Sequence, residues 1–250
     1  MDAGALELCD SLNALRYLLK KYDFCGIGGH AVNVILAHHI YAVVQDKNCV
    51  DREVFELRRA GLVRQMRMLA SPTSTFLALE TEYRGAVLAV SRAKRENGEE
   101  KASLAFELFA TFVLPNCSDL FIEDEVLRAR LEAGCKGKRI GKSDMVEPLL
   151  NEGFLLHRTN MPEVKCYWFA VPKVGSLVKW ILEARAELKH NVAQSPHKEV
   201  LRSHLVAKSL KKSSIHAVYH VEEMVASRRL RAFDAISDGE GQLIRPGYVP

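Results

Sequence analysis

The sequence predicts an α+β, mainly helical fold in which one unit of helices followed by a β-hairpin occurs three times. An apolar stripe at helical spacing, a helix-ending glycine and a strand start occur together in Val54–Arg64 and again in Val146–Arg158. A looser third copy runs from Val221 to Ala232, with arginine in place of the glycine. Helices followed by a hairpin are the plan of the winged helix. The pattern therefore predicts three tandem winged-helix units, each a helix-turn-helix with a β-hairpin wing.

The three hairpins are predicted from β-branched and aromatic residues on either side of turn-forming residues. The predicted strand pairs are 63–69 with 76–79, 154–157 with 167–171, and 232–236 with 242–244. Room for further helices lies upstream of each pair, at 6–20 and 31–44, at 104–114 and 122–131, and at 199–210. Leucines in the first of these stretches and leucine and phenylalanine in the third have the spacing of a helix with one buried face.

Boundaries between units are predicted where charged and turn-forming residues cluster, at 92–101 and near 194–196. We therefore expect unit 1 over residues 1–97, unit 2 over 98–193 and unit 3 over 194–250. A long amphipathic helix over 174–192, with Leu177, Ile181 and Leu188 on its apolar side, is expected to brace units 2 and 3.

Composition excludes several classes of protein. The chain has 250 residues, of which 48% are hydrophobic and 26% charged, as in a globular protein with a sizeable core. No apolar run approaches the roughly 18 residues that span a bilayer, and the first twenty residues carry acidic groups rather than a basic start. Six cysteines at wide, irregular intervals predict free thiols rather than a zinc site or a disulfide framework. No metal, cofactor or membrane partner is therefore expected.

The distribution of cations, rather than the mild net charge of +4, predicts double-stranded nucleic acid as the partner. Between His197 and Ala232 eight lysines and arginines stand against three glutamates, beside the expected recognition helix of unit 3. The candidate DNA-binding residues are Lys138, Arg139 and Lys142 before the expected recognition helix of unit 2, Lys179, Arg185 and Lys189 on the bracing helix, and Lys198, Lys208, Lys211, Lys212, Arg228 and Arg229 in unit 3.

Unit 1 is expected to bind DNA less strongly, or to contact proteins instead. Its helix-to-strand junction carries four arginines, partly offset by glutamates. These residues are Arg58, Arg59, Arg64 and Arg67, with Glu53 and Glu56.

Motifs that suggest catalysis are incomplete, so the chain is predicted not to be an enzyme. Gly141-Lys142-Ser143 ends like a P-loop, but Lys136 stands where the first glycine is needed. His157-Arg158-Thr159 resembles a kinase catalytic loop with threonine in place of the aspartate that accepts the hydroxyl proton. His30, His38 and His39 have no acidic or cysteine partner at metal-ligand spacing.

Residues in all three units resemble the serine/threonine-protein kinase 19 family over roughly residues 35–245. The resemblance rests on Tyr41, Asp51 and Gly61, on Leu114, Pro115 and Asp119, on Trp168, Gly175 and Lys179, and on Tyr219, His220 and Gly241. Despite its name, the family resembles tandem winged-helix DNA-binding proteins rather than kinases. The resemblance implies a nuclear, chromatin-associated protein that binds double-stranded DNA, and also RNA, and supports transcription-coupled nucleotide excision repair through other repair or transcription proteins. Lys179 and Lys208 match basic DNA-contact positions of the family.

One alternative function stays open alongside duplex binding with little sequence preference. Winged helices also dock proteins, so the chain is alternatively a scaffold in a nuclear repair or transcription complex that touches DNA only incidentally. The acidic turn at 238–240 and the mixed charges of unit 1 favour this alternative. A homodimer is compatible with either function.

Overall fold

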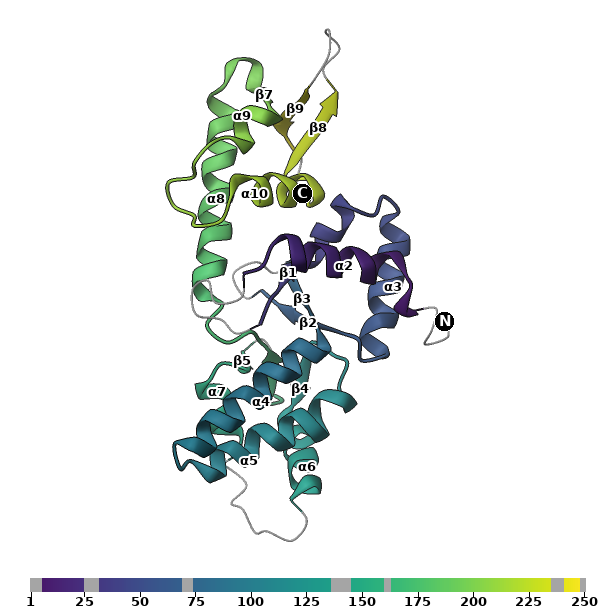
Figure 1. Cartoon of the computed structure of the whole chain (residues 1–250), viewed down its shortest axis with the longest axis vertical. Helices are drawn as coiled ribbons and strands as arrows, with labels where there is room; N and C mark the ends of the chain where they lie inside the picture. The colour runs from purple at the N-terminus through teal and green to yellow at the C-terminus, as the bar shows by residue number, and fades with distance from the viewer. Residues whose placement is uncertain are drawn as a thin grey trace.

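The computed structural model describes residues 6–24, 32–68, 74–135, 145–159, 163–234 and 241–247. Helices and short strands form an elongated α+β molecule, with the first two thirds of the chain at one end and the last third at the other (Figure 1). The candidate DNA-binding residues Lys138, Arg139 and Lys142 lie outside the described residues, as does the P-loop-like turn.

The same order of elements recurs three times: helix, short strand, two helical segments, and two longer strands. The first set is α2 (Asp10–Lys21), β1 (Ile35–Leu36), η2 (Ala37–Ala42), α3 (Lys47–Arg59), β2 (Val63–Arg67) and β3 (Thr75–Leu79). The second is α5 (Glu100–Leu108) with η3 (Phe109–Val113) and η4 (Leu114–Asn116), β4 (Phe121–Glu123), α6 (Asp124–Gly134), α7 (Val146–Asn151), β5 (Leu155–Arg158) and β6 (Cys166–Phe169). The third is α8 (Gly175–Gln194) with η5 (Pro196–Lys198), β7 (Val200–Leu201), α9 (Arg202–Val206), α10 (Ala217–Ala226), β8 (Leu230–Asp234) and β9 (Gln242–Pro246).

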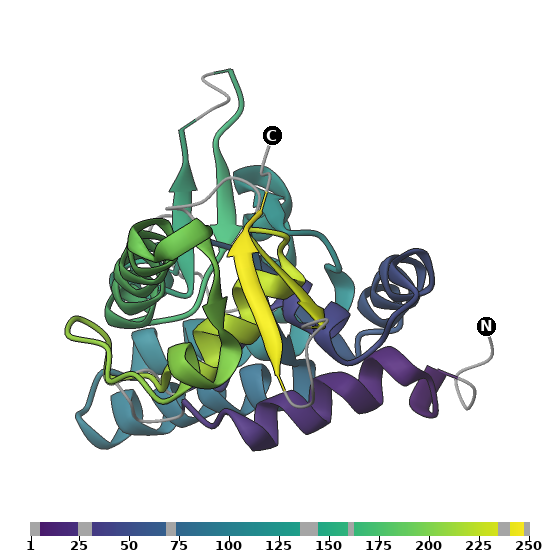
Figure 2. The ribbon, with the colours of Figure 1, turned by 90° about the horizontal axis from the view of Figure 1, so that it is seen from above.

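Each set builds one three-stranded antiparallel sheet, and the last strand always lies in the centre. The orders are β1-β3-β2, β4-β6-β5 and β7-β9-β8. The three predicted hairpins are confirmed: Val63 pairs with Leu79, Leu155 with Phe169 and Leu230 with Pro246. Figure 2 shows the hairpin of β5 and β6 extending away from the rest of the molecule.

The first strand of every sheet was not predicted. The stretch 31–44, expected to be a helix, contains β1 and the 3-10 segment η2, because its apolar run pairs with β3 through Ile35 and Leu36. The stretches 122–131 and 199–210 likewise begin with strands β4 and β7 before their helices. The polar stretch 92–101, expected to separate two units, contains the end of the long helix α4 (Glu80–Glu96), the turn at 97–99 and the start of α5, which packs against α4.

Three apolar cores hold the sheets and helices together. One lies between α2, α3 and one face of the first sheet, where Leu15, Leu57 and Leu77 are buried. A larger one joins the opposite face of that sheet, through Met66 and Phe76, to the helices and sheet of the second set. The sheet β1-β3-β2 is therefore covered on both faces, and the first two sets share a core.

The third core depends on α8, which spans two cores as a brace. Leu177 and Ile181 in its first half belong to the larger core, whereas Ala184, Leu188 and Val192 in its second half pack with α9, α10 and β9. The predicted bracing role of this helix is confirmed.

A buried ion pair also fastens the first set to the second. Arg64, predicted as part of a cationic junction, is only 4% exposed. Its Nε and Nη2 donate to Glu80 at 2.7 Å each, and its remaining donors reach the carbonyls of Cys117 and Leu114. Arg64 is therefore an internal structural cation and is not available to a partner.

The helix that precedes each hairpin ends at a residue in the left-handed region. These residues are Gly61 (φ 68°), Gly153 (φ 82°) and Arg228 (φ 60°). The N–H of Gly61 donates to the carbonyl of Arg58, and that of Leu62 donates to the carbonyl of Leu57. The third copy therefore keeps the backbone turn with arginine, although glycine adopts that conformation at lower cost.

Replacing Gly61 by alanine should lower the free energy of unfolding by about 1 kcal/mol, because a Cβ strains this backbone conformation. Gly85, inside α4, is a matched control, since a Cβ at either position meets nothing within 4 Å. Gly85→Ala should instead raise the free energy of unfolding by about 1 kcal/mol through better helix propensity. Urea denaturation of both variants measures the two changes, and equal signs would contradict the role given to Gly61.

Candidate nucleic-acid interface

The loop between α9 and α10 presents three exposed lysines beside α8. The Nζ of Lys208 donates to Asn191 Oδ1 at 2.9 Å, and the backbone N–H of Lys211 donates to the Glu187 carboxylate at 3.2 Å. The side chains of Lys211 and Lys212 are exposed and make no ion pair in the part of the chain that the structure describes. The loop is thus fixed through its backbone while two of its charges remain free for an anion.

Lys179 and Lys189 lie on the exposed side of α8, but not on the same side as the loop. Glu187 and Asn191, which face the loop, are one turn apart, and Lys189 stands two residues from each, about 200° around the helix. Around the helix, Lys179 lies between the side that carries Glu187 and the side that carries Lys189. Along the helix axis it lies about 15 Å from Lys189. Lysines therefore surround the outer half of α8 rather than forming a single row.

Arg185, predicted to contact DNA, is buried in the interior. It is 6% exposed, and its Nε and Nη2 donate to the Glu223 carboxylate of α10 at 3.1 and 2.6 Å. The prediction that it binds DNA is wrong in this structure, because a buried paired guanidinium cannot meet a phosphate. Its place four residues after Ile181 and three before Leu188 was the available signal, since that spacing is the buried face of the helix.

The remaining candidates lie at two other places. Lys198 is exposed in η5, beyond the end of α8. Arg228 and Arg229 follow α10 at the opposite end from the lysine loop, a helix length of about 15 Å away. Arg228 is exposed, whereas Arg229 is partly buried and lies 3.9 Å from Glu223.

The third helix of the third set is covered by the first set, which corrects the expectation of a free recognition helix in unit 3. Helix α10 packs against η2, as Figure 1 shows. Of its ten residues only Val218, Glu222 and Val225 are even partly exposed. A signal was present in the sequence, because a helix that is apolar on nearly all sides is a buried one.

Two adjacent glutamates of α10 link the third set to the first through hydrogen bonds and ion pairs. Glu222 accepts from Lys21 at 3.0 Å and from the Tyr22 hydroxyl at 2.6 Å. Glu223, 0% exposed, accepts from Arg185 and lies 2.6 Å from His38 Nε2. Burial alone would raise the pKa of each carboxyl, but these hydrogen bonds and charges lower both pKa values to about 2.

The corresponding third helix of the first set, α3, is open to solvent. Asn48, Arg52, Phe55 and Arg59 are exposed, and their spacing places them along one face. Phe55 is 51% exposed, with the guanidinium of Arg59 5.8 Å from its ring centre. The sequence-based prediction stressed the arginines of this unit and missed the exposed phenylalanine, although the spacing of these four residues on α3 could have shown it.

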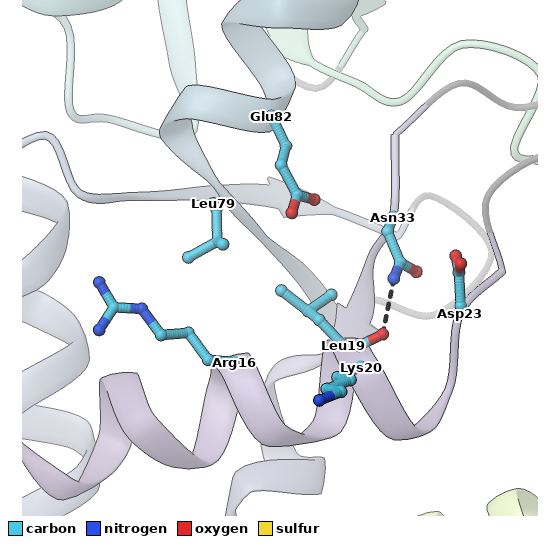
Figure 3. Close-up of a pocket in the computed structure, with 7 residues that line it drawn as sticks. All are labelled: Arg16, Leu19, Lys20, Asp23, Asn33, Leu79 and Glu82. Carbon is cyan, nitrogen blue, oxygen red and sulfur yellow. Dashed lines mark hydrogen bonds between the residues drawn. The ribbon is translucent and has the colours of Figure 1, made fainter.

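A cavity of about 520 Å³ lies between α2 and the start of α4 (Figure 3). Its lining has balanced charges, with Arg16 and Lys20 against Asp23 and Glu82. Asn33 donates to the Leu19 carbonyl at 2.8 Å, which ties the lining together. Burial and the charge of Asp23 raise the pKa of Glu82. This arrangement has no excess of one charge and favours no particular ligand.

Two of the residues that resembled a kinase catalytic loop lie in a β-strand and pack against aromatic rings. His157 and Arg158 belong to β5, where the Arg158 guanidinium lies 4.2 Å from the Phe121 ring centre and 4.5 Å from that of Trp168. Within the described ranges no group of three potential metal ligands occurs, no helix is long and apolar enough to cross a bilayer, and the five cysteines are free.

Three small antiparallel sheets with packed helices define an α+β protein. Residues 29–233 match the family described as inactive serine-threonine protein kinase 19, and the chain belongs to this family. That description confirms the predicted resemblance and the prediction that the chain is not a kinase.

Three relatives carry the name winged helix repair factor 1. The human protein is 26% identical over 215 residues, which cover 85% of this chain and 76% of the relative. The mouse protein is 24% identical over 214 residues, with the same coverage. The protein from Xenopus laevis is 22% identical over 213 residues, covering 85% of this chain and 74% of the relative.

Proposed function

We propose that the chain is a repair-related protein made of three tandem winged-helix units that binds double-stranded DNA with little sequence preference. The threefold recurrence of helix, short strand, helices and hairpin supports the three units. The proposal keeps the predicted boundary at 97/98 and moves the one predicted at 193/194 to the start of α8. Since α8 supplies the third core, its packing favours starting unit 3 at Gly175.

The observation that carries DNA binding is the lysine loop fixed against α8. Lys208, Lys211 and Lys212 are exposed on a segment whose backbone is held by Glu187. Phosphates are neutralised by such cations, which release counterions on binding. Lys179 and Lys189 add cations to other parts of the exposed face of α8, and Lys198 adds one beyond its end.

Low sequence preference follows from the covered position of α10. Base edges in the major groove are read by an inserted helix, whereas phosphate contacts carry no direct sequence information. Helix α10 packs on η2 and cannot enter a groove without separating the two sets. We therefore expect unit 3 to hold the DNA backbone.

The names of the relatives support a role in DNA repair. We extend this to a nuclear, chromatin-associated protein that supports transcription-coupled nucleotide excision repair together with other repair or transcription proteins. RNA duplexes are an additional proposed ligand, since phosphate contacts are common to both nucleic acids.

Replacing Lys208, Lys211 and Lys212 together by glutamate should weaken binding to blunt duplex DNA by more than about tenfold and reduce the slope of log affinity against log salt by about 3. The matched control replaces the exposed Arg84, Arg92 and Lys101 of α4 and α5 by glutamate, with the same change in net charge. Fluorescence anisotropy across a salt series measures both. Equal losses in the two variants, or a wild-type affinity independent of salt, would contradict the proposal.

The exposed face of α3 supports a second candidate function, docking of a protein partner in a nuclear complex. Exposed phenylalanine beside arginines is typical of interface anchors. Under this alternative, Phe55→Ser should abolish capture of a defined repair factor, while the triple lysine variant leaves it intact. The opposite pattern favours the DNA-binding function.

A further inference from the structure

A cleft of about 570 Å³ lies at the seam between the first and third sets, away from the lysine loop. One wall comes from α2, the end of η2 and the start of α3, and the other from α9, α10 and the third sheet. Its volume lies within the range of sites that hold small molecules. We call this space the seam cleft.

Cations outnumber carboxylates in and beside the seam cleft. Lys21, Lys47 and Arg202 line it, together with the single carboxylate Glu222. Glu222 accepts from Lys21 and Arg202, so one carboxylate serves two cations. The floor therefore keeps a positive charge.

Lys47 adds a second positive charge at the edge of the cleft, close to Arg228. Burial lowers the pKa of Lys47 and the charge of Arg228 lowers it further, while Asp51 opposes both effects. Asp51 already accepts a hydrogen bond from the Tyr41 hydroxyl. The positive charges of Lys47 and Arg228 therefore act on each other unfavourably, and an anion bound beside Lys47 in the cleft would relieve this repulsion.

Aromatic rings accompany these cations. Tyr17 is 54% exposed at the mouth of the cleft, and the Lys47 ammonium lies 5.1 Å from the ring centre of Tyr41. Val43, 44% exposed, adds apolar surface to the lining. At the back, Gln242 accepts from Arg202 through Oε1 at 2.8 Å, which leaves its amide N–H groups able to donate.

Positive groups interleaved with exposed rings are what single-stranded nucleic acid requires, because phosphates need cations and unstacked bases need flat apolar surfaces. A duplex is too wide for a space of this volume. We propose that the seam cleft binds the unpaired nucleotides of a strand that continues from a duplex, so that the protein recognises single-strand to double-strand junctions. This inference rests on the proposed function, since the lysine loop supplies the duplex contact.

The test compares a blunt duplex with the same duplex carrying a short oligothymidine overhang at either end. The wild-type protein should bind one of the overhang substrates at least fivefold more tightly than the blunt duplex. Tyr17→Ala combined with Lys47→Glu should remove this gain and leave blunt-duplex affinity within twofold of wild type. Lys20→Glu, an exposed position on the same helix that lines the other cavity, should keep the gain.

Competing ligands show whether the seam cleft binds a nucleic-acid strand, a free nucleotide or an acidic peptide. An oligothymidine strand should compete for the overhang gain, whereas thymidine monophosphate at equal nucleotide concentration should compete at least tenfold less. Equal competition would overturn the junction in favour of a free-nucleotide site. No gain from either overhang, or an acidic peptide that competes as well as the strand, would also overturn the inference.

The two proposals fail in distinguishable ways. If the triple lysine variant binds blunt duplex normally while the Tyr17/Lys47 variant loses the overhang gain, the lysine loop fails as the duplex site and the seam cleft stands. If the lysine variant loses blunt binding and no overhang improves wild-type binding, the seam cleft fails and the proposed function stands.

Discussion

Replacing Glu223 by alanine should lower the free energy of unfolding by about 3–5 kcal/mol, because it leaves buried positive charge without a partner. The carboxylate is fully buried and receives two hydrogen bonds from Arg185, with Arg229 3.9 Å away. It also joins α10 to His38 of η2, so its loss weakens contacts within the third set and between sets.

Glu107 is the matched control for this substitution. Its pair with Arg95 has an oxygen-to-nitrogen distance of 2.5 Å, close to that of the buried pair, but side chains that are 40% and 58% exposed. Glu107→Ala should cost less than about 1 kcal/mol, since solvent screens an exposed pair. Combining Arg185→Leu with Glu223→Leu should recover part of the loss, because both charges are then removed. Chemical denaturation measures all three variants, and similar losses for Glu223→Ala and Glu107→Ala would contradict this account.

Acid should destabilise the protein well above the pH at which carboxylates titrate. Burial lowers the pKa of His220 to about 4; Glu223 opposes this shift, and the positive charge of Arg185 adds to it. The unfolded chain, with an ordinary histidine pKa near 6.5, therefore binds a proton more readily than the folded chain. The contribution of His220 to the free energy of unfolding is therefore fully present above about pH 6.5 and is lost as the pH falls towards 4.

This linkage corresponds to a loss of about 2 kcal/mol between pH 7.5 and pH 5 from His220 alone. A second decline, from Glu222 and Glu223, is expected as pH falls from 4.5 to about 2. Urea denaturation at a series of pH values should show a flatter profile between pH 6.5 and 4 for His220→Gln. The exposed His204→Gln should keep the wild-type profile. An unchanged slope in His220→Gln would contradict the assignment.

The sequence predicted those parts of the fold that are encoded locally. The three hairpins were recognisable because helix-ending residues such as Gly61 and Gly153 are followed by strand-forming residues and turns. The strands β1 and β7 were missed because each has only two residues, and such a strand exists through its distant partner. Ile35 becomes a strand residue by pairing with Leu77, a contact that local propensity does not contain.

The candidate site was predictable only in part, for a similar reason. Exposed lysines in a turn-rich loop, such as Lys208 and Lys211, are found from sequence because lysines and serines make up most of the stretch 208–214. Arg185 resembles them in type, and only its position on the apolar face of α8 separates it from them. Helix α10 is covered by η2, which lies about 180 residues earlier in the chain. Neither segment alone indicates that the two meet.

The brace formed by α8 means that the repeats cannot be separated by cutting the chain at their sequence boundaries. A fragment ending near residue 174 would expose Phe169 and its neighbours in the larger core, and one starting at 194 would lack the helix on which α9 and α10 fold. Cooperative unfolding should therefore involve the whole chain, and proteolysis should yield either intact protein or small peptides rather than three stable fragments.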